Sequence, residues 1–132
     1  VLLRAAQSVE EVARKDIASH ELNMTEFAVL ELLYHKGNQP IQIIGKKVLI
    51  ASSSITYVVD KLVKKGYVER VACPDDRRVT FAAITDEGKQ FTQKIYPQHE
   101  QKMATIFEGF TESELEQATE LLKKIGYQAE KL

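Results

Sequence analysis

The two ends of the chain repeat apolar residues at helical spacing. Residues 1–20 follow an i, i+3, i+4, i+7 pattern that predicts one apolar stripe: Leu2, Leu3, Ala6, Val9, Val12, Ala13 and Ile17. The closing segment opens at Thr111, three residues before Glu114, which is the spacing of a capping box. Its stripe comprises Leu115, Ala118, Leu121, Leu122 and Ile125. Both ends are therefore predicted to be amphipathic helices, the first ending near His20 and the second ended or weakened at Gly126.

Two helices are predicted in the segment between Thr25 and Val48. Thr25 offers a capping hydroxyl to the first, which is broadly apolar, is expected to be buried and stops at Gly37. Pro40 suits the start of the second, because the first turn of a helix leaves its amides unpaired anyway. This second helix is short and continues to Val48.

A further helix is predicted after a tight connection at Leu49 and Ile50. Three consecutive serines, Ser52 to Ser54, supply capping hydroxyls. The inward stripe of this helix comprises Ile55, Val58, Val59, Leu62 and Val63. Two short helices joined by a few residues have the plan of a helix-turn-helix.

The pattern becomes strand-like after Gly66. Residues 67–71 lead into a turn at Pro74-Asp75-Asp76, and residues 79–84 return from it, which predicts a β-hairpin. Thr85 followed by two acids then predicts a helix start, with negative charge at the positive end of the helix dipole. This helix is expected to continue to Phe107, with a kink or a break at Pro97.

Charge changes the interpretation of the middle of the chain. The 132 residues carry a formal net charge of −1. Residues 37–80 hold eight basic and four acidic side chains, a balance of +4, so the two flanks together carry −5. A positive middle between acidic ends indicates that the middle meets a polyanion. A solvated charged face without a partner is the alternative reading.

Other function classes find little support in the sequence. There is no glycine-rich phosphate loop, no HExxH and no GxSxG motif, so we expect no enzyme and no cofactor. His20, His35 and His99 lie far apart in sequence and are not expected to bind metal. The lone Cys73 forms no internal disulfide, and no apolar run spans a membrane or forms a signal peptide, so a cytoplasmic location is expected. The sequence begins at Val1 without methionine, which is compatible with missing native N-terminal residues.

Three segments are informative together: LNMTEFAVLELL at residues 22–33, SSSITYVVDKLVKKGYVER at 52–70 and PDDRRVTFAAITDEGK at 74–89. With the order of the predicted elements, they resemble the MarR family of winged helix-turn-helix regulators over nearly the whole chain. The resemblance implies a mainly α fold with a small β-hairpin wing. It also implies one domain, in which residues 25–85 form the DNA-binding part and residues 1–20 and 86–132 form dimerisation helices.

The predicted helix after Leu49 and Ile50 corresponds to the family's recognition helix. Small hydroxyl side chains at its N-terminus let a helix approach the major groove closely, and the helix dipole favours phosphate there. The candidates for DNA contact are Ser52, Ser53, Ser54, Thr56, Tyr57 and Lys61. The serines have an alternative role as helix caps only. Many members of the family carry arginine at the position of Tyr57.

Asp76 and Arg78 match the family's D-x-R pattern in the wing. The resemblance implies that Asp76 orients Arg78, which enters the minor groove, while Arg77 contacts phosphate. A solvent-exposed turn pair is the alternative. The remaining candidates for phosphate contact are Lys46, Lys47, Lys64 and Lys65.

The resemblance further implies a homodimer on a pseudo-palindromic operator in double-stranded DNA, because two-fold symmetry pairs two recognition helices with two half-sites. The expected interface residues are Leu2, Leu3, Ala6, Leu115, Leu121, Leu122 and Ile125. Packing of the same residues within one subunit is the alternative.

We therefore expect a sequence-specific transcription regulator, acting as a repressor that a small phenolic or otherwise aromatic ligand releases. The resemblance implies a ligand crevice between the DNA-binding and dimer parts, for which Phe27 and Tyr34 are candidates unless they belong to the core. One alternative is a winged-helix interaction module without DNA binding. Another is a redox-sensing regulator, since exposure of Cys73 at the hairpin tip would permit oxidation, although the neighbouring Asp75 and Asp76 oppose the reactive anionic thiol.

Overall fold

The computed structural model describes residues 1–48 and 52–132, so the connection predicted at Leu49 and Ile50 lies outside the described residues. The described elements, in chain order, are α1 (Leu2–Ala18), α2 (Met24–Lys36), β1 (Gln39–Pro40), α3 (Ile41–Lys47), α4 (Ser52–Lys64), β2 (Val68–Ala72), β3 (Thr80–Ile84), α5 (Asp86–Ala104), the 3-10 turn η1 (Thr105–Phe107) and α6 (Glu112–Glu130).

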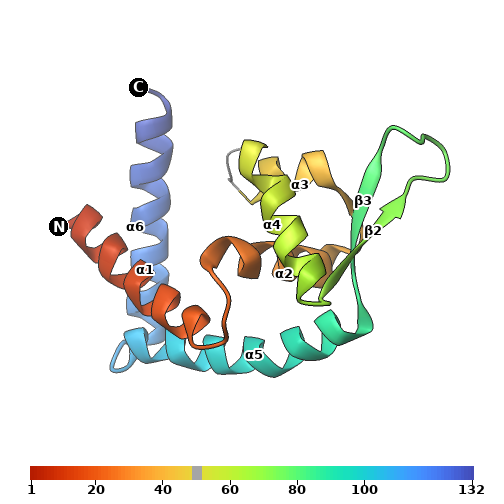
Figure 1. Cartoon of the computed structure of the whole chain (residues 1–132). Helices are drawn as coiled ribbons and strands as arrows, with labels where there is room; N and C mark the ends of the chain where they lie inside the picture. The colour runs from red at the N-terminus through yellow and green to blue at the C-terminus, as the bar shows by residue number, and fades with distance from the viewer. Residues whose placement is uncertain (49–51) are drawn as a thin grey trace.

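The elements divide into a packed centre and two extensions (Figure 1). Helices α2, α3 and α4 form the centre, and the β2–β3 hairpin projects from one side of it. Helix α5 runs beneath the centre and carries the chain from the base of the hairpin to the opposite end, where α6 rises at a steep angle (Figure 1). The hairpin and α6 therefore lie at opposite ends of the molecule.

The hydrophobic core lies where α2 and α4 face each other. Leu30 and Leu33 of α2 and Val59 and Leu62 of α4 are at most 1% exposed. The broadly apolar pattern of residues 25–37 predicted this burial, and the i, i+3, i+4 stripe of α4 packs inward as predicted. The full cluster adds Ile17, Leu22, Phe27, Val29, Ile44, Ile55, Val58, Val68, Ala82 and Ile95.

The predicted hairpin is present and gains a third strand. Strands β2 and β3 pair antiparallel with Val68 opposite Ile84 and Ala72 opposite Thr80. The short β1 pairs with the other edge of β3, placing Pro40 opposite Phe81. Pro40 thus anchors the start of α3 to the hairpin, a long-range pairing that the local pattern did not predict.

The base of the hairpin is locked onto α5. Gly66 adopts φ +84°, a left-handed conformation that favours glycine, and its carbonyl accepts a 2.6 Å hydrogen bond from the Thr85 hydroxyl. Thr85 also caps α5 as predicted, accepting from the Gly88 amide at 3.0 Å. A Cβ on Gly88 would lie 2.2 Å from the Tyr67 carbonyl oxygen, so only glycine permits this close approach.

Several predicted boundaries are wrong. Asn23, not Thr25, caps α2 through a reciprocal box with Glu26. Helix α5 continues through Pro97, where its packing against α1 and α2 retains the helix despite one missing amide. The break expected at Pro97 is therefore wrong, whereas the kink stays a prediction. It ends at Ala104, and the 3-10 turn η1 occupies residues 105–107. Helix α6 also continues past Gly126 to Glu130.

Helix α6 begins at the predicted Thr111–Glu114 capping box, yet it has no buried residue. None of the helices that the described residues form is both long enough and apolar enough to cross a membrane.

Candidate nucleic-acid interface

Helix α4 presents a polar face opposite its buried stripe. Thr56 and Tyr57 are exposed, and Ser54 and Lys61 are half-buried, whereas Ile55, Val58, Val59 and Leu62 are buried. Ser52 and Ser53 belong to the first turn of the helix, and the roles predicted for their side chains stay predictions. The 3.6-residue period therefore separates the core-forming residues from the candidates for DNA contact, as the sequence predicted.

Tyr57 and Lys61 form a pair on this face. They stand one helical turn apart, and the Lys61 ammonium lies 5.1 Å from the centroid of the Tyr57 ring. This is within the range of about 6 Å for a cation–π contact. Tyr57 remains 61% exposed. The pair thus offers an aromatic face, a phenol hydroxyl and a positive charge at one site.

The tip of the wing holds Arg78 in a defined orientation. Asp76 accepts three hydrogen bonds from Arg78: from its backbone amide at 3.0 Å, from Nε at 3.2 Å and from Nη2 at 3.3 Å. These bonds, led by that from the Arg78 side chain, lower the pKa of Asp76 below its ordinary value. The Arg78 side chain remains 90% exposed. Asp76 thus holds an arginine that faces solvent, and the minor-groove contact of Arg78 stays a prediction.

The wing and the two short helices meet in one cleft of about 210 Å³. Thr56 of α4, Arg70 of β2 and Arg78 of the wing line it. Arg70 also forms an ion pair with Asp60 of α4, which joins the hairpin to the helix. The remaining lining residues are Pro40, Ile41, Gln42, Val79 and Thr80. The fold therefore brings predicted contacts from α4 and from the wing to a common face.

The lysines predicted to contact phosphate divide into two groups. Lys46, Lys47 and Lys64 are exposed, and the Lys47 ammonium donates to Gln39 Oε1 at 3.0 Å. Lys65 differs, because its ammonium lies 2.7 Å from both Glu26 Oε2 and the Glu21 carbonyl oxygen. The prediction for Lys65 is therefore wrong, since its charge is used inside the subunit.

Most of the residues predicted to form the dimer interface are exposed to solvent in the subunit. Leu3 is 77% exposed, and Leu121, Leu122 and Ile125 are between 51% and 60% exposed. Leu2 and Ala6 are also exposed, and Leu115 is half-buried. Packing within one subunit, the alternative at these positions, does not cover them in this structure.

Phe27 and Tyr34 lie where α2 meets α5. Phe27 is buried and stacks on Tyr96, with ring centroids 6.5 Å apart and planes 6° apart. Tyr34 meets the edge of His35 at 5.1 Å, and His35 meets Tyr96 at 5.7 Å. Phe27 therefore contributes to the core at the junction of the DNA-binding and terminal parts, and Tyr34 extends an aromatic row from it.

Sequence reasoning missed a polar cluster beside Phe27. Asp16 Oδ2 lies 2.8 Å from His99 Nδ1 and 4.0 Å from His20 Nε2, although 83 residues separate Asp16 from His99. His20 Nε2 is buried without a hydrogen-bond partner in the structure. The only local signal was the i, i+4 spacing of Asp16 and His20. In the part of the chain that the structure describes, no cluster of three or more His, Cys, Asp or Glu residues could hold a metal ion.

Cys73 is half-buried directly after β2, and its amide donates to the Val79 carbonyl at 3.1 Å. The residue thus closes the hairpin before the Pro74 turn and is less exposed than a tip position implies.

Comparison with known proteins agrees with this geometry. The model of the MarR family matches residues 22–80, the stretch from the start of α2 to the start of β3. The HTH-type transcriptional regulator MhqR of Bacillus subtilis is 52% identical over 129 residues, which cover 98% of this chain and 89% of that protein.

Solved structures share the fold. A MarR family transcriptional regulator from Streptomyces coelicolor, solved in complex with DNA, matches with a TM-score of 0.84 at 22% identity, covering 95% of this chain and 81% of that one. BpsR of Bordetella bronchiseptica, whose DNA binding is regulated by 6-hydroxynicotinic acid, matches with a TM-score of 0.80 at 24% identity, covering 95% of this chain and 89% of that one. Together with the 52% identity to a regulator along nearly its whole length, the winged helix identifies this chain as a transcriptional regulator that belongs to the MarR family.

Proposed function

We propose that the chain is a homodimeric repressor that binds a pseudo-palindromic operator and is released by a small aromatic ligand. The observation that carries this proposal is the common face formed by the polar side of α4 and the Arg78 tip of the wing. Residues 25–85 form the DNA-binding part, and residues 1–20 and 86–132 form the dimer part.

The polar face of α4 enters the major groove in this proposal. Thr56, Tyr57 and Lys61 then face base edges, with Ser52, Ser53 and Ser54 at the N-terminal end of the helix near the phosphates. The exposed Lys46 and Lys47 contact the phosphate backbone. Arg78 enters the narrow and strongly negative minor groove, and Arg77 contacts an adjacent phosphate. The MarR family regulator from Streptomyces coelicolor, solved with DNA, supports such contact for the shared fold.

A second copy of the chain covers the exposed leucines of α1 and α6. An apolar stripe in which Leu3, Leu121, Leu122 and Ile125 are each more than half exposed is unfavourable for an isolated subunit. A two-fold axis through this interface places two α4 helices about one turn of DNA apart. The acidic balance of the flanks keeps them away from the phosphates that the basic middle contacts.

The junction of α1, α2 and α5 is the proposed ligand-responsive region. It combines the aromatic residues Phe27 and Tyr34 with the unpaired nitrogen of His20. A phenolic hydroxyl that reaches this nitrogen would satisfy a buried polar atom. Regulation of BpsR by 6-hydroxynicotinic acid supports an aromatic effector for this fold. Ligand binding there would separate α1 and α5 from α2. The distance between the two α4 helices of the dimer would change as a result.

The test begins with selection of DNA from a random pool by the wild-type protein. We expect an inverted repeat, bound by a species of twice 15.0 kDa in sedimentation. Selection of no sequence, with a stable fold, would instead favour an interaction module. Candidate phenols are then titrated into the complex, and a phenol that releases DNA from the wild type but not from His20→Ala supports the ligand proposal. Cys73→Ser serves as the control, because a redox sensor would lose its response to oxidants in that variant.

A further inference from the structure

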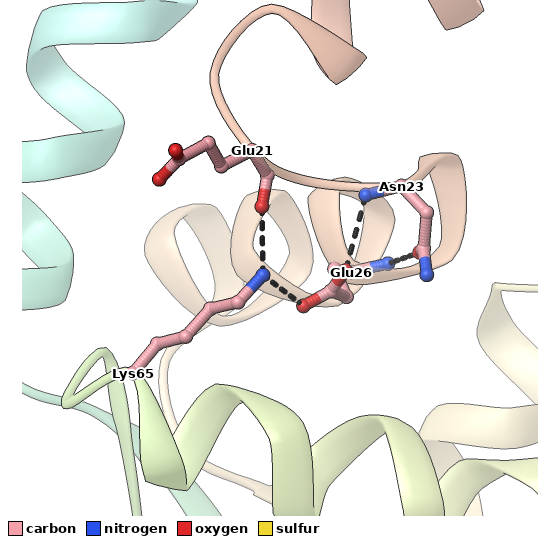
Figure 2. Close-up of polar contacts among 4 residues, drawn as sticks. All are labelled: Glu21, Asn23, Glu26 and Lys65. Carbon is pink, nitrogen blue, oxygen red and sulfur yellow. Dashed lines mark hydrogen bonds and ion pairs between the residues drawn. The ribbon is translucent and has the colours of Figure 1, made fainter.

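Lys65 connects the end of the recognition helix to a distant turn of the chain. It follows α4 directly, and its ammonium lies 2.7 Å from Glu26 Oε2 and 2.7 Å from the carbonyl oxygen of Glu21 (Figure 2). Glu21 belongs to the turn between α1 and α2, and Glu26 lies in the first turn of α2. One side chain from the DNA-binding part therefore binds two points at the corner where the N-terminal helix joins it.

Glu26 uses its two carboxylate oxygens for different purposes. Oε1 accepts from the Asn23 amide at 3.1 Å and completes the capping box of α2, in which the Glu26 amide donates to Asn23 Oδ1 at 2.8 Å (Figure 2). Oε2 is left for Lys65. A glutamine would serve the cap equally well, because capping boxes accept either residue. The negative charge therefore serves the contact with Lys65, not the cap.

The burial of this pair makes the contact specific. The Glu26 side chain is 3% exposed, whereas the Lys65 side chain is 34% exposed. A buried carboxylate requires hydrogen-bonding partners, so removal of Lys65 leaves Glu26 with an unpaired oxygen and an uncompensated charge. Replacement of both partners of such a pair by well-packed apolar residues of similar volume is often neutral or stabilising. A role beyond stability would therefore come from the elements that the pair connects, namely the end of α4 and the corner between α1 and α2.

The turn that receives Lys65 has a defined backbone. Glu21 is a non-glycine residue with φ +62°, in the left-handed region that ordinary side chains seldom adopt. Its amide donates to the Ala18 carbonyl at 3.0 Å, so the turn continues the last turn of α1. The Glu21 carbonyl is thereby aimed at Lys65. The position of the Lys65 ammonium therefore depends on the path that the chain takes after α1.

A small change of orientation at the Lys65 end of α4 produces a larger displacement at the Ser52 end, which is proposed to contact DNA. The 13 residues of α4 span about 20 Å, with Ser52 at one end and Lys65 just beyond the other. A tilt of about 5° at the Lys65 end moves the Ser52 end by roughly 2 Å on a helix of that length. Hydrogen bonds to base edges do not survive such a displacement, since their donor–acceptor distances vary by only about 0.5 Å.

We infer that the Glu26–Lys65 pair is a positioning contact, which holds the recognition helix at a fixed orientation to the α1–α2 corner and so sets the spacing of half-sites that the dimer accepts. This inference rests on the proposed function, because spacing has meaning only for a dimer that binds two half-sites. Lys65 itself does not touch DNA. It acts through the orientation of Thr56, Tyr57 and Lys61 at the other end of α4.

The experiment compares DNA fragments that carry the operator selected by the wild type with fragments whose half-sites are moved apart or together by one base pair. Lys65→Met keeps the aliphatic stem and removes the charge, whereas Glu26→Gln keeps the capping acceptor. We expect either variant to reduce the preference for the selected spacing by about 2- to 30-fold, the range of coupling energies for residues that link two parts of a protein. The double variant loses no more than the single ones, because both remove one contact.

Two controls separate positioning from stability. Lys89→Met removes an exposed charge on α5, away from the predicted DNA contacts, and retains the wild-type preference. Lys65→Arg retains a donor that reaches both oxygens and restores most of the preference. Thermal unfolding is measured for each variant, and binding is measured well below the lowest midpoint.

The outcomes are distinguishable. A lower unfolding temperature with an unchanged spacing preference would overturn the inference and leave a purely structural pair. Unchanged stability and unchanged preference would overturn it as well. A wild type that selects no DNA would refute the proposed function and this inference with it, whereas a wild type that selects an inverted repeat leaves the inference to stand or fall on the variants alone.

Discussion

Helices α4 and α6 are both amphipathic, yet they differ in what covers the apolar side. In α4, Val59 and Leu62 are fully buried against α2. In α6, Leu121 and Leu122 remain 60% and 53% exposed. The two helices thus share the same 3.6-residue period, but the apolar side of α4 is buried within the subunit and that of α6 is exposed.

The difference shows that an apolar stripe predicts burial without identifying the partner. Helix α4 packs against α2, so its partner is in the same subunit. Helix α6 follows the long α5, which carries it away from the core (Figure 1). A second subunit is therefore the proposed partner of α6. This contrast divides the chain into a reading region (residues 25–85), whose core-forming apolar side chains are covered within the subunit, and an assembling region (residues 1–20 and 86–132), whose exposed leucines require a partner.

The largest effect is expected from charge placed on the exposed stripe of α6. Leu122→Glu combined with Ile125→Glu puts two carboxylates where a partner must desolvate them, which opposes association. Sedimentation should then show a 15.0 kDa species. Operator affinity should fall about 100-fold or more, because linked binding of two half-sites is lost.

Lys123→Glu is the matched control, since it also changes the charge of α6 by −2 but lies on a face of the helix turned away from the leucines. Circular dichroism and the unfolding midpoint of the double variant should indicate an intact centre, because α6 contributes no buried residue to it. A double variant that remains dimeric would place the interface elsewhere. It would then contradict the proposal that a second subunit covers the apolar side of α6.

The next effect concerns the wing, in the reading region. Arg78→Ala should cost on the order of 1 to 3 kcal/mol of DNA binding per subunit, the range for close contacts in a groove. Its side chain is 90% exposed, so folding and dimerisation should not change. Titration against one operator fragment at fixed salt measures the loss.

Lys89→Ala on α5 is the charge-matched control for Arg78. Asp76→Ala should weaken binding less than Arg78→Ala, because it frees the arginine without deleting it. Equal affinities for the Arg78 and Lys89 variants would mean that the wing does not contact DNA.

A smaller effect is expected from single phosphate contacts. Operator affinity should fall steeply between about 50 and 200 mM salt, as lysines and arginines displace counterions. Lys46→Ala should reduce the slope of log affinity against log salt by about 1 per subunit. Lys124→Ala, on α6, should leave the slope unchanged, and an equal change from both lysines would erase the electrostatic distinction between the two regions.

The smallest effect concerns the cap of α6 in acid. Hydrogen bonds from Thr111, the backbone amide first, lower the pKa of Glu114. A lowered pKa means that the ionised carboxylate stabilises the folded helix above the ordinary pKa of glutamic acid, and that this contribution is lost as the pH falls through the lowered value. Because Glu114 is fully exposed, solvent screens the effect.

Glu114→Gln retains the capping acceptor and does not titrate. The wild type should therefore be more helical than this variant at neutral pH, and the difference should shrink as the pH falls. Circular dichroism at 222 nm, the wavelength conventionally used for helix, measures it. A difference that grows in acid would contradict the assigned role of Glu114.

Local chemistry predicted much of the fold correctly. Thr85 and Thr111 cap their helices as expected, and the wing appears between its predicted strands. The errors arose where two local signals competed or where packing outweighed one. Asn23 and Thr25 both offered capping oxygens near one helix start, and the tertiary contacts of α5 retained the helix at Pro97.

For the site, the sequence predicted the polar face of α4 and the Asp76–Arg78 pair, because partners within one turn are fixed by backbone geometry. It did not predict that Asp16 meets His99, 83 residues away. It also assigned Lys65 to phosphate, although the ammonium binds Glu26, 39 residues earlier in the chain.

The sequence by itself determined which residues share a face, where helices begin, and which segment carries positive charge. These properties depend on the period of the backbone and on side chains within one turn of each other. The tertiary structure alone decided which face finds a partner within the subunit and which lysine is free to contact DNA. The reason is physical: burial and ion pairing depend on distances in space between segments, and a local pattern does not contain those distances.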